Sequence, residues 1–263
     1  MFYLANPITN NLNSLIDFIR LRLCFFVIFV GISGYLLFNA PSFKIIFVGM
    51  SSFFACSGVY AYNQMTDVKE DTINRRKINP LAHSKMGLLT VFLCFTLGLS
   101  FSLFLSMLSI VYCIIFTGIG IAYSLFRIKR IFLIKNIYTG FGLSLLFLLG
   151  TNSIQIGGEI LYYVLVSIFA FTGSMVADIN DREGDKAVGA KTIPVIFGHE
   201  KSKTVLYLLL VAFSGFVLLL DKTIVLLPFS LIMIACVSRN RFRVAHAFSG
   251  ISFIFLTVWL LLT

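Results

Sequence analysis

Apolar stretches long enough to cross a bilayer recur along the whole chain. A transmembrane helix needs about 20 predominantly apolar residues, and this chain of 263 residues is 59% hydrophobic and only 12% charged. A spanning segment must satisfy its own backbone hydrogen bonds, which favours a helix for each stretch. The sequence predicts an all-α integral membrane protein whose nine transmembrane helices lie at about residues 14–38, 43–66, 86–106, 108–126, 132–150, 159–180, 203–220, 223–237 and 245–262.

The basic residues predict how these helices are oriented. A net charge of +10 would by itself suggest a nucleic-acid partner. With the N-terminus in the cytoplasm, however, all of the 21 basic residues except Lys44 and Lys222 fall on the cytoplasmic side of the nine spans. This is the asymmetry of the positive-inside rule. We therefore expect a multi-pass protein of the cell membrane with a cytoplasmic N-terminus, an external C-terminus and no nucleic-acid partner.

Two acidic segments follow the second and the sixth predicted spans. Seven of the eleven acidic residues lie in these segments, and both segments are expected on the cytoplasmic side. Their spacing of four residues places side chains on one face of a helix, where carboxylates repel unless cations, waters or basic partners neutralise them. The candidate positions are Asn63, Asp67 and Asp71 in the first segment and Asp178, Asp181 and Asp185 in the second.

Hard oxygen ligands of this kind favour Mg²⁺, which is commonly held by one or two carboxylates together with substrate phosphates. Neither segment contains histidine or cysteine, which argues against zinc or iron. The chain has no GxxxxGK phosphate loop, so a nucleotide is not indicated. We predict Mg²⁺ as the cofactor, all six positions as its ligands, and Asp67, Asp71, Asp181 and Asp185 as the catalytic acids.

Basic residues near the same membrane face suggest what the cations bind. Tyr123 and Arg127 are one helical turn apart, and the guanidinium group suits multidentate contact with phosphate. Lys129 follows them, and Arg22 lies where the first span enters the membrane. We predict these four residues as a diphosphate site. An isoprenoid diphosphate would fit, because its tail can enter the apolar bundle.

These motifs resemble the UbiA superfamily of intramembrane prenyltransferases over nearly the whole chain. The similar elements are Asn63-xxx-Asp67-xxx-Asp71, Asp181-xxx-Asp185 and Tyr123-xxx-Arg127, together with the nine-helix count. The resemblance implies a bundle around a central cavity with a cytoplasmic cap and a lateral opening to lipid. It also implies one magnesium at the first motif, another at the second, and the diphosphate near the third.

The chain also departs from the family pattern. Gln64 stands where the family often has Asp, and Arg127 stands where the family has Lys. The Arg-Pro pair near the first helix is missing, which leaves Arg20 or Arg22 as its counterpart. The run over residues 183–198 is similar to members that act in archaeal-type lipid-ether and quinone pathways.

We therefore predict a single domain over residues 1–263 that transfers a polyprenyl group, with Mg²⁺, from its diphosphate to a hydrophobic acceptor in the bilayer. The acceptor is left open between an aromatic or quinone precursor and a glycerol-based lipid, and no obligate protein partner is indicated. One alternative is a membrane terpene cyclase or diphosphate lyase, which ionises the same substrate without an acceptor. The other is a cation transporter, which predicts acids near mid-membrane rather than at helix ends.

Overall fold

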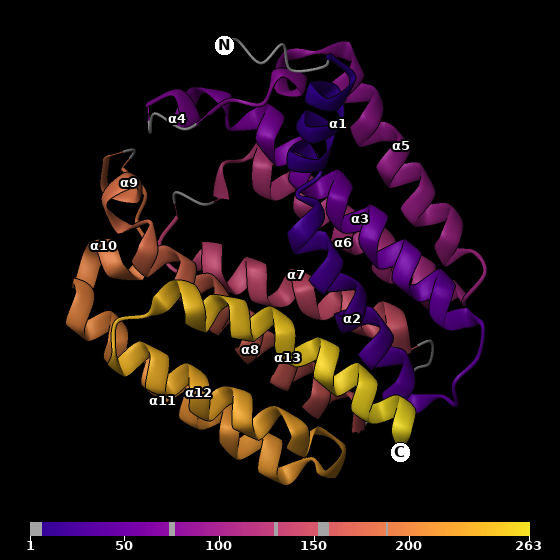
Figure 1. Ribbon diagram of the computed structural model, residues 1–263, viewed down its shortest axis with the longest axis vertical. Helices are drawn as coiled ribbons and strands as arrows, with labels where there is room; N and C mark the ends of the chain where they lie inside the picture. The colour runs from indigo at the N-terminus through magenta and orange to yellow at the C-terminus, as the bar shows by residue number, and fades with distance from the viewer. Residues whose placement is uncertain (1–6, 74–76, 129–130, 152–157, 188) are drawn as a thin grey trace, which may run out of the picture.

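The computed structural model describes residues 7–73, 77–128, 131–151, 158–187 and 189–263. This described part is helical and contains no β-strand, as the sequence predicts (Figure 1). Its long helices are α1 (Pro7–Phe18), α2 (Leu21–Phe38), α3 (Lys44–Thr66), α5 (Lys85–Ser102), α6 (Met107–Leu125), α7 (Ile134–Thr151), α8 (Gly158–Asn180), α11 (His199–Leu219), α12 (Leu227–Ser238) and α13 (Phe242–Leu262). The short ones are α4 (Val68–Ile73), α9 (Arg182–Ala187), α10 (Ile193–Phe197) and the 3₁₀ helices η1 (Pro80–His83) and η3 (Asp221–Leu226).

Eight helical stretches of the described chain are long and apolar enough to cross a membrane. They are α2, α3, α5, α6, α8, α11, η3 with α12, and α13. The predicted count of nine is therefore not confirmed. The fifth predicted span, α7, is a helix of 18 residues packed against α2, α6 and α8. Its first turns carry the polar residues Lys135, Asn136, Tyr138 and Thr139, and it is not among these eight stretches.

The first predicted span, residues 14–38, is two helices rather than one. Arg20 separates α1 from α2 with φ 49° and ψ 52°, a left-handed conformation that is uncommon for a residue other than glycine. The Gln64 side chain on α3 donates to the carbonyl oxygens of Asp17 and Phe18, at 2.9 and 3.0 Å, and so ties the end of α1 to α3. The break places Arg20 beside the end of α3.

Small residues allow the central helices to pack closely. The pairs α3–α5, α7–α8, α2–α7 and α2–α3 form the most extensive interfaces. At the α2–α7 crossing, a Cβ atom on Gly34 would run into the Phe147 carbonyl, and one on Gly150 would run into the Gly31 carbonyl. Membrane bundles use small residues in this way because lipid provides no hydrophobic force between helices.

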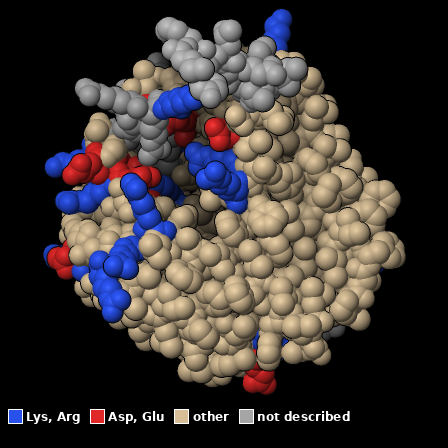
Figure 2. Space-filling model, in the orientation of Figure 1, with Lys and Arg blue, Asp and Glu red and all other residues tan. Residues whose placement is uncertain are grey.

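One end of the bundle is polar and carries the short helices α4, α9 and α10 (Figure 1). Acidic and basic side chains gather at this end around a hollow, whereas most of the remaining visible face is uncharged (Figure 2). Large apolar side chains such as Phe92 on α5 and Leu208 on α11 are exposed on the outside of the bundle. This distribution suits a multi-pass membrane protein whose sides contact lipid and whose polar end contacts water.

Candidate active site

A cavity of about 500 Å³ opens at the polar end of the bundle. Residues of α2, α3, α6, α7, α8 and α13 line it, together with residues of the short helices α4 and α9. Its inner wall is mainly apolar and includes Val30, Phe116, Ile119, Leu143 and Phe253. The fold brings both acidic segments to this one cavity, which is lined by all six predicted metal ligands: Asn63, Asp67, Asp71, Asp178, Asp181 and Asp185.

Helical register holds the first acidic set together. The Asp67 amide donates to the Asn63 carbonyl, and the Asp71 amide donates to the Asp67 carbonyl, both at 2.9 Å. The three side chains therefore follow successive turns across the junction of α3 and α4. The Asn63 amide nitrogen donates to Asp67 Oδ2 at 3.0 Å, and Ser124 of α6 donates to Asn63 Oδ1 at 3.1 Å. These two bonds fix the orientation of the amide toward the cavity acids.

The second set repeats this register at the junction of α8 and α9. The Asp181 amide donates to the Ala177 carbonyl at 3.0 Å, and the Asp185 amide donates to the Asp181 carbonyl at 2.9 Å. Asp181 and Asp185 thus stand on successive turns, as Asp67 and Asp71 do. The two junctions present matching pairs of carboxylates to the cavity.

Asp178 has a different environment from the other acids. Its side chain is only 1% exposed, and Lys135 of α7 makes an ion pair with its Oδ1 atom. Asn136 donates to Asp178 Oδ2 at 2.8 Å and to Ser174 Oγ at 3.0 Å. The Lys135 ammonium also lies 3.6 Å from Asp185 Oδ2. Both oxygens of Asp178 therefore already have protein partners, and Lys135 reaches from Asp178 toward Asp185.

The carboxyl group of Asp185 lies in a site that favours a cation. Burial raises the pKa of Asp185 above its ordinary value; Lys135 opposes this shift, while Asp178 and Asp181 add to it. Its Oδ2 atom is buried and accepts no hydrogen bond from the part of the chain that the structure describes. A bound cation would satisfy this oxygen and offset the repulsion between the neighbouring carboxylates.

The arrangement suits a cation that protein carboxylates and substrate phosphates hold together, as they commonly hold Mg²⁺. Within the described residues, no three His, Cys, Asp or Glu side chains converge as a ready metal site. Each junction instead offers a pair of carboxylates, and Asn63 lines the cavity beside the first pair, with its amide oxygen accepting from Ser124. Mg²⁺ is commonly held by one or two carboxylates plus oxygens of a substrate phosphate, so two such pairs suit it.

The predicted diphosphate residues are only partly brought to the cavity. Tyr123 lines it and stacks on Tyr138, with ring centroids 5.5 Å apart. Arg127 follows the end of α6 with φ 51°, is exposed, and does not line the cavity. Arg22 is also exposed and away from the cavity lining. Lys129 lies outside the described residues. The diphosphate-binding roles of all four stay predictions.

Three basic residues of the cavity were not among the predicted site residues, although Arg20 was considered as an alternative to Arg22. Arg20 lines the cavity, with its Cζ atom 5.2 Å from the centre of the Tyr60 ring. Lys135 and His246 line it as well. The signal for Arg20 was its place beside Arg22, and the signal for Lys135 was a lysine directly before Asn136 at the start of an apolar run. Nothing in the sequence indicated that His246, a single histidine in the last apolar run, would line the cavity.

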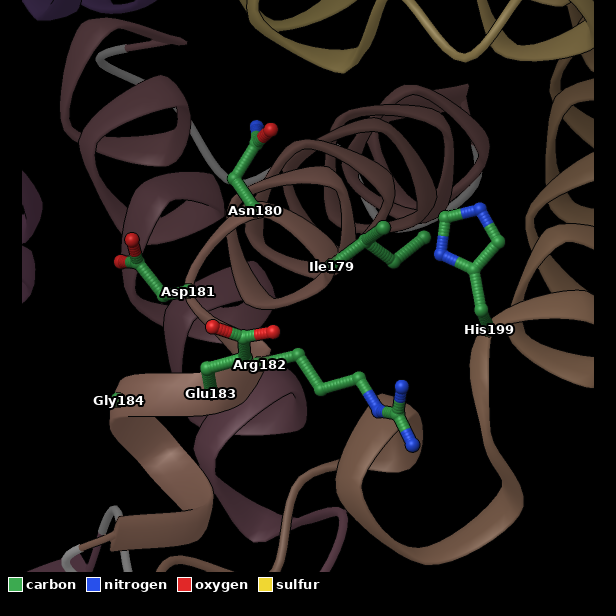
Figure 3. A pocket seen from close by; sticks show the side chains of 7 residues that line it. All are labelled: Ile179, Asn180, Asp181, Arg182, Glu183, Gly184 and His199. Carbon is green, nitrogen blue, oxygen red and sulfur yellow. The ribbon is translucent and has the colours of Figure 1, made fainter.

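A second, smaller pocket of about 350 Å³ lies outside the corner between α8 and α9 (Figure 3). Asp181 borders both hollows, and it points away from Arg182 and His199. Arg182 Nε donates to the Pro194 carbonyl at 2.9 Å, and His199 Nε2 lies 3.4 Å from Asn240 Oδ1. These polar groups join α9 to α10 and α11 to the turn before α13.

The fold and the site together define a membrane-embedded helical protein with paired carboxylates at the mouth of an apolar chamber. The model of the UbiA prenyltransferase family matches residues 23–261. The chain therefore belongs to this family, as its motifs indicate.

Relatives and solved structures agree with this assignment. The chain is 28% identical over 199 residues to a digeranylgeranylglyceryl phosphate synthase of Pyrococcus furiosus, which covers 71% of this chain and 70% of that one. A synthase of the same name from Methanobrevibacter smithii is 28% identical over 203 residues, covering 73% and 71%.

Two solved structures share the fold. The apo structure of a UbiA homologue from Aeropyrum pernix matches with a TM-score of 0.76 at 14% identity and covers 92% of this chain and 97% of that one. A UbiA homologue from Archaeoglobus fulgidus, bound to GPP and Mg²⁺, matches with a TM-score of 0.74 at 19% identity and covers 95% and 100%.

Proposed function

We propose that this protein transfers a polyprenyl group from an isoprenoid diphosphate to the free hydroxyl of a glycerol-based lipid, with Mg²⁺, inside the membrane. The observation that carries the proposal is the single cavity in which both carboxylate pairs meet an apolar chamber. The paired acids suit a cation-bound diphosphate, and the apolar wall suits a prenyl chain. The paired acids alone would not require a substrate with an apolar chain, and the apolar wall alone would not require a charged head group.

The acidic residues would hold the cations that bind the diphosphate. Asn63, Asp67 and Asp71 form one station and Asp181 and Asp185 the other. Bound Mg²⁺ would stabilise the negative charge that develops on the diphosphate as the allylic C–O bond breaks. Since Asp178 already has two protein partners, we infer that it orients Lys135 rather than binding the metal.

Two basic side chains in the cavity would balance the remaining charge. Lys135 lies beside Asp185, and Arg20 lies beside Tyr60 near the first acidic set. Preorganised cations of this kind stabilise developing charge without reorganising during the reaction. We infer that Arg20, rather than Arg22, acts from the start of α2, because Arg20 lines the cavity and Arg22 is exposed.

The relatives support a glycerol-based lipid over an aromatic acceptor. The relatives from Pyrococcus furiosus and Methanobrevibacter smithii are both named digeranylgeranylglyceryl phosphate synthase. A product of that kind requires a glycerol lipid whose remaining hydroxyl receives the second chain. We infer that such an acceptor would bring its hydroxyl to the acidic mouth of the cavity, beside the bound diphosphate.

An acceptor panel tests the proposal. Purified protein in nanodiscs would receive geranylgeranyl diphosphate and Mg²⁺ with a glycerol phosphate monoether lipid, with an aromatic ring acid, or with no acceptor. We expect diphosphate release and a doubly prenylated lipid, detected by mass spectrometry, only with the glycerol lipid. Release without any acceptor would support a cyclase or lyase instead. Absence of release in every mixture, together with Mg²⁺ flux into liposomes, would support the transporter.

A further inference from the structure

His246 presents an unsatisfied nitrogen at the cavity. It lies on the second turn of α13, and its side chain lines the same chamber as the two acidic sets. Its Nδ1 atom is buried and has no hydrogen-bond partner among the described residues. A buried polar atom left unpaired costs free energy that a ligand hydrogen bond would recover. The atom therefore indicates a polar group of a ligand at this position.

The surroundings of His246 place that polar group between the acidic mouth and the apolar chamber. The imidazole lies against the backbone of Gly173 on α8 and feels the charge of Asp181. Gly173, Ala247 and Gly250 also line the cavity here, so no large side chain covers the ring from these positions. A ligand group beside Nδ1 would thus lie near the second acidic station.

We propose that His246 is the general base that accepts the hydroxyl proton of the lipid acceptor. The inference rests on the proposed function and adds a catalytic residue to it. The acceptor oxygen forms a bond to C1 of the prenyl chain while the bond from C1 to the diphosphate oxygen breaks, and the electron pair of that bond leaves with diphosphate. The hydroxyl proton passes to Nδ1 of His246 and from there to water.

The cavity chemistry favours this residue over its neighbours. A neutral imidazole can accept a proton on one ring nitrogen while the other keeps its own, which suits a base that must both take up and release a proton. The carboxylates of the two stations would hold cations or lie beside Lys135, and Tyr123 and Lys135 are proton donors at neutral pH. Of the histidines in the described chain, His83 is exposed on η1 and His199 lines the outer pocket, so neither reaches the chamber.

The test measures transfer to the lipid acceptor separately from cleavage of the prenyl diphosphate. His246→Gln keeps a polar side chain but cannot act as a base, and His246→Ala leaves space for added imidazole. We expect both variants to lower transfer to the glycerol lipid by about 100-fold or more. With that lipid present, diphosphate release should fall less than transfer, because water then receives part of the prenyl group and gives prenyl alcohol. Added imidazole should restore part of the transfer in His246→Ala alone. His83→Ala, which changes an exposed histidine, is the matched control and should behave as the wild type.

The experiment distinguishes failure of the general-base role from failure of the proposed function. Transfer at the wild-type rate by His246→Gln would overturn the general-base role while leaving the proposed function standing. Equal loss of transfer and of diphosphate cleavage, without rescue by imidazole, would also overturn it, because it would show a structural role. A wild-type protein that transfers to no glycerol lipid would remove the proposed function and this inference together.

Discussion

Lys135 places an ammonium group between two carboxylates of the cavity. Asp178 is 1% exposed and Lys135 is 22% exposed, so the pair is largely shielded from water. Removing one partner of a buried ion pair leaves an uncompensated charge, which costs more than the pair itself contributes. The stability of the fold therefore depends on Lys135 even though its second neighbour, Asp185, belongs to the proposed reaction site.

We expect Lys135→Met to lower the free energy of unfolding by about 3 kcal/mol, because Asp178 would remain buried and charged. The double variant Lys135→Met with Asp178→Asn should recover most of this loss, since no buried charge remains. Thermal unfolding of the purified variants in detergent would measure both effects.

Lys203→Met is the control for this comparison. Lys203 lies 3.8 Å from Glu200, whose side chain is 81% exposed. Lys203 is itself 14% exposed, but replacing it leaves the Glu200 carboxylate in water rather than buried. The loss should therefore stay below about 1 kcal/mol, and this variant should unfold close to the wild type. Equal losses from Lys135→Met and Lys203→Met would show that burial of Asp178 does not increase the cost of removing its partner.

Which basic residues reach the cavity could not be predicted from the sequence. Arg20 and Arg22 are two positions apart, so they point in nearly opposite directions wherever helical geometry holds. Choosing between them requires knowing where α2 begins, and the left-handed backbone at Arg20 has no hydropathy signature. Lys135 and Asp178 are 43 positions apart in the chain, on α7 and α8, and the spacing of residues within each helix does not show which faces meet.

At the scale of the helices, the spacing of the acids predicted how the acidic residues are arranged, whereas the basic residues of the cavity could not be predicted. Each set lies on consecutive helical turns in the structure because the backbone bonds of α3 continue into α4 and those of α8 continue into α9. A spacing of four residues is enough to predict this local arrangement. It could not predict that Asp178, one turn earlier, would be turned toward α7 instead.

The crossing of α2 and α7 forms one wall of the bundle and depends on glycine. We expect Gly34→Ala to lower the free energy of unfolding by about 1–3 kcal/mol, because the added methyl group would meet the Phe147 carbonyl on the opposite helix. Backbone atoms cannot move aside as a flexible side chain can. Thermal unfolding in detergent would measure the loss.

Gly215→Ala provides the matched comparison on α11, where a Cβ atom would meet no other atom within 4 Å. This variant should be as stable as the wild type or slightly more stable, because alanine favours the helix over glycine. If both substitutions lowered stability equally, close packing at the α2–α7 crossing would not be the cause.

For the molecule as a whole, the charge distribution makes a prediction about orientation. The polar end carries α4, α9 and α10, while α13 ends at the opposite side of the bundle (Figure 1). Together with the positive-inside rule, this predicts a cytoplasmic cavity mouth and an external C-terminus. It also requires an odd number of crossings, which α7 would supply as the ninth.

Cysteine labelling would measure this orientation. Four of the five native cysteines are buried, so a background with Cys236 replaced should react little. In whole cells, we expect a membrane-impermeant thiol reagent to label Thr263→Cys but to label Lys77→Cys only after lysis. Labelling of both positions from the same side would contradict the predicted orientation and leave α7 outside the count of spans.

The class of fold could be predicted because membrane-length apolar runs constrain a chain strongly. Within lipid, such a span must satisfy all of its backbone hydrogen bonds, which only an α-helix or a closed β-barrel allows. The exact count could not be predicted, because α7 mixes polar residues that face the cavity with an apolar remainder. The same residues that weaken its membrane signal are the ones that build the site.

The central claim is that the two acidic sets act together on one diphosphate. The most direct measurement is acceptor-dependent diphosphate release by the wild type, by Asp67→Asn, by Asp181→Asn and by their double variant, with Asp221→Asn on η3 as a control outside the cavity. We predict a loss of about 100-fold or more in each single cavity variant, little further loss in the double variant because the sets act as a unit, and wild-type release by the control. Wild-type release by either single cavity variant would contradict the claim.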